Sequence, residues 1–408
     1  MKRLFNLLFL TLSLSVCAQV KPGIEVLRDN NFDILKGKRV GLITNPTGVD
    51  NSLVSTVDIL AAASDVKLMG LYGPEHGVRG DIHAGDHVDN TTDAKTGVPV
   101  YSIYGKTRKP TPEMLKDIDV LVYDIQDNGC RSYTFISSMG LAMEACAELG
   151  KEFVVLDRPN PVGGNIVEGN LVEDNCVSFV SQFPIPYLYG LTPGELARYL
   201  NEEGLLGNGK KVNLTVVPMV GYHRNMDFRE TGMPWILPSP HMPTPESVAY
   251  YPATGILGEL YFMSIGVGYT LPFKLMCAEW IDAEDFAARL NEKNIPGVNF
   301  RPIHIKPFYS TGQGKNLQGV EIYITDREKA PLTMIQFYAM EVLADMYPQG
   351  RVFENADEKR FDMFDKVCGS KEIRKRFSKN YKVADIVDYW NKDNESFRRK
   401  SSKYYLYK

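Results

Sequence analysis

Residues 73–87 read GPEHGVRGDIHAGDH and concentrate side chains that can transfer protons or bind metal ions. The stretch contains one glutamate, two aspartates, one arginine and three of the chain's six histidines. Imidazole and carboxylate groups serve both zinc binding and general acid/base catalysis. The spacing of these residues, and the elements that position them, must decide between the two chemistries.

The metal interpretation uses His76, His83 and His87 together with Asp81 or Asp86. Zinc accepts imidazole and carboxylate ligands, but this spacing is not that of a helical HExxH site. A glycine-rich loop would also have to fold back on itself to gather the ligands. We therefore predict no metal site and no cofactor, and we expect His83 and His87 to lie in an exposed polar loop.

The acid/base interpretation rests on Glu75, with His76 in support. Both residues directly follow a strand-like run, and Gly73, Pro74 and Gly77 around them favour a tight turn. A carboxylate on such a turn can be directed into a crevice at the end of the strand.

A second pair of carboxyl groups, Asp124 and Asp127, lies at the end of the apolar run DVLVYDI. Burial at the end of a hydrophobic strand raises the pKa of a carboxyl group, which suits a general acid near neutral pH. Two carboxyl groups across a crevice are what glycoside hydrolysis requires, since one protonates the leaving oxygen and the other acts as base or nucleophile. The structural alternative is that Asp124 caps the following helix or pairs with Arg131.

The elements around these residues alternate between apolar runs of strand length and helical patterns. Strands are predicted at residues 38–45, 66–73, 98–105, 119–125 and 152–159. Apolar strands separated by helices predict a mostly parallel sheet covered on both faces, in an open α/β domain.

Polar loops follow four of these strands. They are TNPTG, GPEHG, DIQDNGCR and DRPNPVGG. Ligands bind at the carboxyl ends of parallel strands, so we expect these loops to line one crevice. No GxGxxG motif follows the first strand and no GxxxxGK[ST] motif occurs, so a nucleotide cofactor is not indicated.

The pattern predicts three segments. Residues 1–18 form a signal peptide, residues 19–250 an open α/β domain, and residues 251–408 a smaller α+β domain. Residues 234–247 are the predicted crossover, because five prolines in fourteen positions exclude a helix.

The first eighteen residues have a basic start, an apolar centre and a small residue at Ala18, which is the layout of a signal peptide. We therefore expect an exported, periplasmic or secreted protein, with lipid attachment at Cys17 as an alternative. The apolar centre is shorter than the roughly 20 residues that span a bilayer, and no later segment is apolar enough, so no stable membrane insertion is expected.

Composition and cysteine usage narrow the class further. With a net charge of -4, the chain lacks the excess of positive charge that is typical of nucleic-acid-binding proteins. Five cysteines follow the signal peptide, an odd number without a CxxC pair, which predicts buried free thiols.

Seven segments together resemble one known family. They are GLITNPTGVD, LYGPEHGVRGD, TGVPVYSIYG, VLVYDIQDNGCRSYTFISSM, VLDRPNPVGG, VEG and TGMPWILPSPHMPT. In this order, along nearly the whole chain, they are similar to the exo-β-N-acetylmuramidases, long grouped as a domain of unknown function. The resemblance implies a Rossmann-like first domain, a smaller second domain, and an active pocket between them.

The resemblance also implies an activity, namely release of N-acetylmuramic acid from the non-reducing ends of peptidoglycan fragments, with a peptidoglycan-derived saccharide as the partner. Carried over by position, it implies Glu75, Asp124 and Asp127 as catalytic residues. The residues implied to line or brace the pocket are His76, Arg131, Asp157, Arg158, Asn160, Glu168 and Glu259.

One segment departs from the family pattern. Where the family reads similarly to EGTNxSEGRGT, this chain has GELYFMSIGVGYT. Glu259 is kept, but Ile265 and Val267 occupy the later acid and arginine positions. The departure concerns the substrate contacts from the second domain.

Muramic acid carries a lactyl carboxylate, so a selective pocket should present a cation, and arginine binds a carboxylate best. Arg79, Arg131, Arg158 and Arg224 follow predicted strand ends. Arg131 is the first candidate, because it follows DIQD directly. Two other classes stay open: a non-catalytic protein that binds cell-wall fragments, and a metal-dependent amidase or deacetylase acting on the same polymer.

Overall fold

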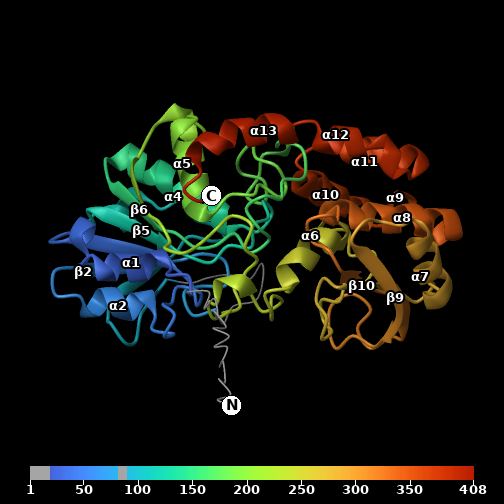
Figure 1. Ribbon diagram of the computed structural model, residues 1–408, viewed down its shortest axis with the longest axis horizontal. Coiled ribbons are helices and arrows are strands. Elements are labelled where there is room, and N and C mark those ends of the chain that lie inside the picture. Colours follow the sequence, from blue (N-terminus) through green and yellow to red (C-terminus); the bar gives the residue numbers. More distant parts are fainter. Residues whose placement is uncertain (1–18, 81–89) are drawn as a thin grey trace, which may run out of the picture.

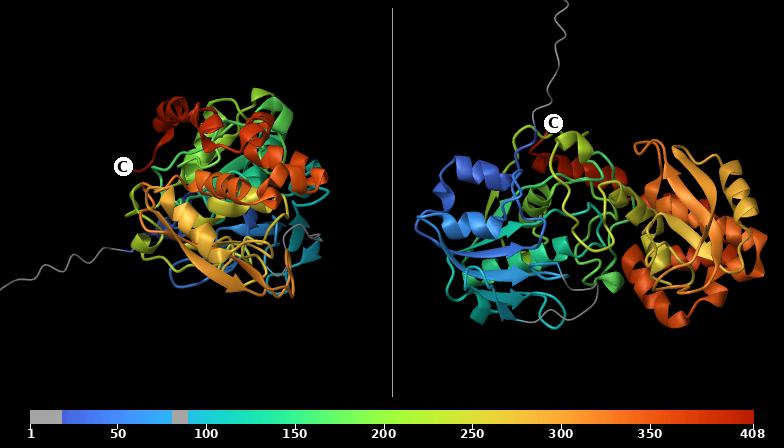
Figure 2. Two further views of the ribbon diagram at one scale, coloured as in Figure 1. Left: turned by 90° about the vertical axis from the view of Figure 1, so that its right-hand side faces the viewer. Right: turned by 90° about the horizontal axis from the view of Figure 1, so that it is seen from below.

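The computed structural model describes residues 19–80 and 90–408, which form two sheet-containing parts lying side by side (Figures 1 and 2). The predicted signal peptide, residues 1–18, lies outside the described residues. So do four candidate metal ligands of the opening stretch, namely Asp81, His83, Asp86 and His87.

The first part is built on a seven-stranded sheet in the order β3-β4-β2-β1-β5-β6-β7. All neighbouring strands are parallel except β3 and β4. The predicted α/β class with a mostly parallel sheet is therefore confirmed. The strands are β1 (Arg39–Thr44), β2 (Lys67–Gly73), β3 (Thr91–Thr92), β4 (Pro99–Ser102), β5 (Val120–Asp124), β6 (Glu152–Leu156) and β7 (Asn213–Val217).

The two strands that the sequence pattern does not predict, β3 and β7, are both at sheet edges. β3 has two exposed residues, and β7 is fully buried only at Val217. A strand that is not covered on both faces lacks the continuous apolar run by which a central parallel strand is recognised.

Helices cover both faces of this sheet, and successive side chains of the central strands enter different cores. Val120 and Val122 of β5 belong to the core beneath α1 and α2, whereas Leu121 and Tyr123 belong to the core beneath α4 and α5. This is the period-two alternation of a strand buried on both faces. The helices of this part are α1 (Gly23–Asp29), α2 (Thr56–Ala62), α3 (Pro112–Leu115), α4 (Phe135–Leu149) and α5 (Pro193–Glu202).

The second part contains a three-stranded antiparallel sheet in the order β8-β10-β9, with helices packed against it (Figure 1). The predicted proline-rich crossover contains no helix before residue 247, where α6 begins. The elements from the crossover to the end of the chain are α6 (Ser247–Gly258), β8 (Leu275–Ala278), α7 (Ala283–Glu292), β9 (Val298–Ile305), β10 (Leu317–Ile324), α8 (Ile335–Met346), α9 (Val352–Asn355), α10 (Phe361–Cys368), α11 (Lys371–Asn380), α12 (Val387–Asn391) and α13 (Asn394–Ser401).

The end of the chain returns to the first part. Figure 1 shows α13 beside α5, and the ring of Phe397 lies 5.2 Å from that of Tyr199. The hydroxyl of Tyr407 donates to Asp157, and the backbone N–H of Arg224 donates to the carbonyl of Lys408. The chain therefore passes between the two parts twice, at the crossover and before α13, which fixes their relative position.

Two further predictions, on membrane-spanning segments and on free thiols, can be compared with the described residues. Within residues 19–80 and 90–408, the helices are too short or too polar to cross a membrane. The predicted buried free thiols are confirmed for the cysteines of this range, which are Cys130, Cys146, Cys176, Cys277 and Cys368.

Candidate active site

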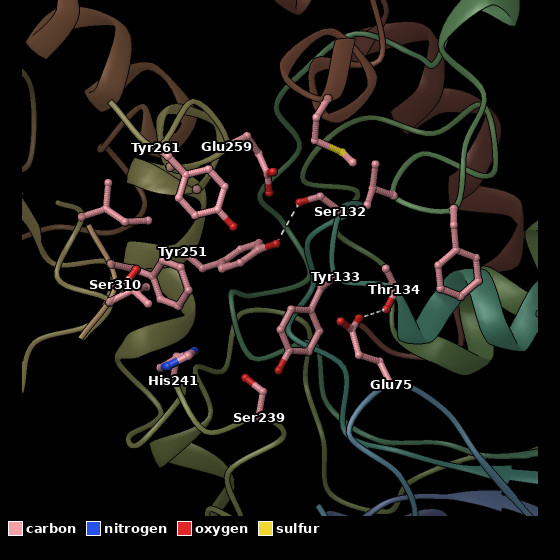
Figure 3. Close-up of a pocket in the computed structure, with 18 of the residues that line it drawn as sticks. Glu75, Ser132, Tyr133, Thr134, Ser239, His241, Tyr251, Glu259, Tyr261 and Ser310 are labelled. Carbon is pink, nitrogen blue, oxygen red and sulfur yellow. Dashed lines mark hydrogen bonds between the residues drawn. The ribbon is translucent and has the colours of Figure 1, made fainter. Parts of the chain in front are cut away.

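A pocket of about 790 Å³ lies where the two parts meet, and both contribute to its lining (Figure 3). The first part supplies the loops after β2, β4 and β5. The second part supplies α6 and the loop that follows it, and the crossover adds Ser239 and His241. Of the ten residues expected at the site, the pocket contains Glu75, His76 and Glu259.

Glu75 and His76 are positioned by a tight turn at the carboxyl end of β2. The N–H of Gly77 donates to the carbonyl of Pro74 at 2.9 Å. The carbonyl of Gly73, the last residue of β2, accepts a hydrogen bond from the N–H of Ile103, which directly follows β4. The turn therefore starts directly from the sheet, as its glycines and proline predict. Glu75 is half-buried and His76 is buried.

Hydroxyl groups hold both carboxyl oxygens of Glu75. Tyr104, after β4, donates to Oε1 at 2.8 Å, and Thr134 donates to Oε2 at 2.6 Å. Thr134 is the N-cap residue of α4, so the carboxylate lies at the positive end of that helix. Burial, and then the charge of Glu75, raise the pKa of Tyr104, which keeps its hydroxyl a donor.

Glu259 faces the pocket from the second part, at the C-terminal end of α6. Burial raises the pKa of Glu259. Arg360, which donates to Oε2 at 3.1 Å, opposes this rise, and the charge of Glu75 adds to it. Figure 3 shows Glu259 beside Tyr261 and Tyr251, and Glu75 beside Tyr133 and Thr134. The pocket therefore holds two carboxyl groups that interact electrostatically.

Aromatic rings form much of the surface between the two carboxyl groups. The ring of Tyr251 contacts those of Tyr133 and Phe273 edge-on, at 5.6 and 5.0 Å between centroids. The hydroxyl of Tyr251 lies 3.2 Å from that of Ser132, as Figure 3 shows. Such a surface offers apolar faces and hydroxyl groups together, which suits a sugar.

The pocket also gathers unusual backbone geometry. Nine non-glycine residues of the described chain have positive φ, and four of them line this pocket. They are His76 (71°), Tyr261 (48°), Phe273 (63°) and Ser310 (63°). The left-handed region is costly for such residues, and outliers of this kind gather at functional sites. Their concentration supports this pocket as the active site.

Asp124 and Asp127 lie behind the pocket and not on its surface. Asp124 is fully buried and accepts two bonds from Arg158, at 2.5 and 3.0 Å, and one from Thr56. Asp127 is also buried, and accepts bonds from Tyr189 and from the N–H of Gly129. Burial raises the pKa of Asp127 to about 7, as predicted for a strand end, but the side chain does not reach the cavity.

Arg131 is also buried, and neither of its predicted environments is found. Its guanidinium donates to the carbonyls of Asn170, Ile185 and Val367 and to the hydroxyl of Ser181. It therefore meets neither the cavity nor an aspartate of DIQD. Burial lowers the pKa of Arg131 to about 10, because no carboxylate compensates the charge.

The other expected residues brace the loops that surround the pocket. Glu168 accepts bonds from the N–H groups of Leu332 and Thr333, and so joins the first part to the start of α8. Asp157 receives hydrogen bonds from Thr192, Gly194 and Tyr407, and Asn160 donates to the carbonyl of Leu191. Arg158 is the partner of Asp124.

The described residues contain no group of three or more His, Cys, Asp or Glu side chains placed to hold a metal ion. His83 and His87 are not among these residues, so their expected exposure stays a prediction.

Comparison with known proteins identifies the family. A model described as "Exo-beta-N-acetylmuramidase NamZ, N-terminal" matches residues 40–246, and the corresponding C-terminal model matches residues 249–407. The chain belongs to this family. The peptidoglycan beta-N-acetylmuramidase NamZ of Bacillus subtilis (strain 168) is 46% identical over 389 residues, which are 95% of this chain and 92% of that protein.

Two solved structures of DUF1343 family proteins from Bacteroides fragilis NCTC 9343 are similar to the whole chain. One is 62% identical with a TM-score of 0.92, and the other is 28% identical with a TM-score of 0.75. Each comparison covers 96% of this chain and 99% of the other. The resemblance drawn from the sequence motifs is thus confirmed. As a member of the exo-beta-N-acetylmuramidase family, the chain is an exo-acting glycosidase.

Sequence reasoning missed several pocket residues. Tyr104, Ser132 and Thr134 lie within the motifs SIYG and CRSYTF, but a hydroxyl side chain in a motif does not reveal which carboxylate it faces. Arg108 and Tyr251 lie outside these motifs, and only the fold brings them to the cavity.

Proposed function

We propose that this pocket releases N-acetylmuramic acid from the non-reducing ends of peptidoglycan fragments, with Glu75 and Glu259 as the catalytic pair. The observation that carries the proposal is the presence of two carboxyl groups in one pocket, one from each part, in a chain of this family. Glycoside hydrolysis divides its work between two such groups.

The two environments suggest different roles. Both oxygens of Glu75 accept hydrogen bonds from hydroxyl groups, which orient the carboxyl group for a role as base or nucleophile. The raised pKa of Glu259 keeps a proton available for the leaving oxygen. Two carboxyl groups with different surroundings in one pocket are the pattern expected of an acid and a base.

Leaving groups of different basicity test these roles. Glu259→Gln should lose about 100-fold or more in kcat on a muramic acid–glucosamine disaccharide, because a sugar alkoxide must be protonated as it leaves. The same variant should keep most of its activity on a dinitrophenyl muraminide, whose leaving group needs no proton. Glu75→Gln should lose activity on both substrates, measured as initial rates.

Glu113→Gln, an exposed substitution on α3, is the matched control and should behave as the unmodified enzyme. Near-normal turnover by Glu75→Gln would remove Glu75 from the mechanism. Equal losses by Glu259→Gln on the two substrates would show that Glu259 does not protonate the leaving group.

We also propose that the protein is exported and acts in the periplasm or outside the cell. The support is the signal-peptide pattern of residues 1–18 together with a polymeric cell-wall substrate. Mass spectrometry of the mature N-terminus should find Gln19. An acylated Cys17 would indicate the lipoprotein alternative, and an intact Met1 in cytoplasmic fractions would contradict export.

A further inference from the structure

We propose that Arg108 binds the carboxylate of the substrate's lactyl group and so selects muramic acid over glucosamine. The inference rests on the proposed function, because it assumes that a muramic acid residue occupies this pocket. Arg108 lies in the loop between β4 and α3 and lines the cavity, and it is exposed. Arg108 takes the role that the sequence predicts for Arg131, whose N–H groups donate to backbone carbonyls and to the hydroxyl of Ser181.

The cations of the pocket differ in their availability. Lys366 also lines the cavity, but its ammonium group lies 2.6 Å from Asp362. Arg360 lies beside the cavity and is committed to Glu259. Arg108 forms no ion pair with any carboxylate of the described chain, so its charge is available to a ligand.

An aromatic ring holds Arg108 in place without using its N–H donors. Its guanidinium carbon lies 4.7 Å from the centroid of the Phe179 ring, a cation–π contact. The guanidinium forms no hydrogen bond or ion pair with the described residues, so its N–H groups can donate two parallel hydrogen bonds to a carboxylate.

The same contacts place Arg108 close to the reacting centre. The ring of Phe179 lies 5.9 Å from that of Tyr104, whose hydroxyl donates to Glu75. Two aromatic side chains in contact, Phe179 and Tyr104, therefore connect the cation to the catalytic carboxylate. The lactyl group and the glycosidic bond belong to the same sugar ring, so the two protein groups that meet them must be neighbours.

The opposite wall offers no alternative cation in the segment that departs from the family pattern. Met263, Ile265 and Val267 contribute apolar side chains to the lining. A carboxylate directed at these three side chains would lose its hydration without gaining a partner, which is costly. The charged substituent should therefore point toward Arg108, and the apolar face of the sugar toward these residues.

A substrate–enzyme cycle tests the assignment. The kcat/KM values for a nitrophenyl N-acetylmuraminide and its lactyl methyl ester are measured with the unmodified enzyme and with Arg108→Gln. The unmodified enzyme should prefer the free acid by about 10- to 100-fold, as expected for a charge-assisted hydrogen-bonded pair. Arg108→Gln should reduce this preference to near unity while changing the rate on the ester little. Steric effects of the methyl group cancel in the comparison.

Lys106→Gln is the matched control, because Lys106 is an exposed cation of the same loop that does not line the cavity. It should keep the full preference. Arg108→Lys should show an intermediate preference, since it keeps the charge but loses the planar pair of donors. Thermal unfolding of each variant verifies the fold.

An unchanged preference in both Arg108 variants would overturn the assignment and leave the glycosidase proposal standing. Equal rates of the unmodified enzyme on acid and ester would likewise overturn it. If the unmodified enzyme hydrolysed a glucosaminide but no muraminide, the proposed substrate itself would be wrong. Failure of the inference and failure of the function it rests on are therefore distinct results.

Discussion

The two walls of the pocket differ in how they are built and in what they contribute. The wall from the first part follows the carboxyl ends of parallel strands and carries the hydroxyl groups and charges: Glu75, Tyr104, Arg108 and Thr134. The wall from the second part is formed by α6, the loop that follows it, the loop between β9 and β10, and α10. It is rich in apolar and aromatic side chains, with Glu259, Lys366, Ser310 and Thr311 as its polar residues. The first wall thus carries Glu75 and the hydroxyl groups that orient it, and the second adds one carboxyl group to a largely apolar surface.

This difference has a physical basis. Loops that start from a hydrogen-bonded sheet inherit its rigidity, which a catalytic group needs because small displacements are costly in rate. An apolar surface that only packs against a sugar tolerates changes in its side chains, provided that volume is kept. The departure of the GELYFMSIGVGYT segment from the family pattern therefore falls on the wall that can accommodate it.

The largest expected effect lies behind the polar wall and concerns stability. Asp124→Asn leaves Arg158 as a buried charge without its partner, which should cost about 3–5 kcal/mol in the free energy of unfolding. Chemical denaturation measures this cost, with Asp117→Asn, exposed on the same part, as the control. If Asp124→Asn were as stable as the control but lost turnover, the aspartate would have the catalytic role first expected of it.

The hydroxyl donors of the polar wall should matter next. Tyr104→Phe removes one of the bonds that orient Glu75, and we expect about a 10-fold loss in kcat with KM little changed, since a bond to a charged group is lost. Steady-state kinetics measures this, and Tyr101→Phe on β4 serves as the control. An unchanged kcat would mean that Thr134 and the helix end orient Glu75 without Tyr104.

The aromatic wall should show a smaller effect of a different kind. Tyr261 lines the cavity with 60% of its surface exposed, so Tyr261→Ala should raise KM by about 2- to 10-fold, the loss expected of one aromatic contact, while kcat stays similar. Tyr323→Ala, at an exposed tyrosine outside the pocket, should change neither. A fall in kcat equal to that of Tyr104→Phe would erase the distinction between the walls.

The smallest effect concerns pH. Arg360 opposes the rise in the pKa of Glu259, so Arg360→Gln should raise that pKa further. If protonated Glu259 is the acid, activity falls as pH increases through its pKa, and the basic limb of the kcat/KM profile should move to higher pH. Arg360→Lys keeps the charge and should move it less. A shift to lower pH would contradict the role of Glu259 as the acid.

Local patterns predicted the central sheet well. The apolar runs that became β1, β2, β4, β5 and β6 are recognisable because a strand buried on both faces must be apolar at nearly every position. The turn at Glu75 is equally local, since its glycines and proline act within a few residues. Edge strands and the return of the chain end to the first part have no such local signal.

By itself the sequence determined the parallel sheet, the edge of that sheet at which ligands bind, and the placement of Glu75 on it, because each depends on residue types within a short window. Only the tertiary structure decided which polar groups face the cavity. Asp124, Asp127 and Arg131 lie in the same loop region as Tyr133 and Thr134, but they turn inward to buried partners. A polar side chain at the end of a strand can either brace the loop or contact the substrate, and its residue type is the same in both cases. Which of the two it does depends on partners that are distant in the sequence, such as Arg158 and Tyr189.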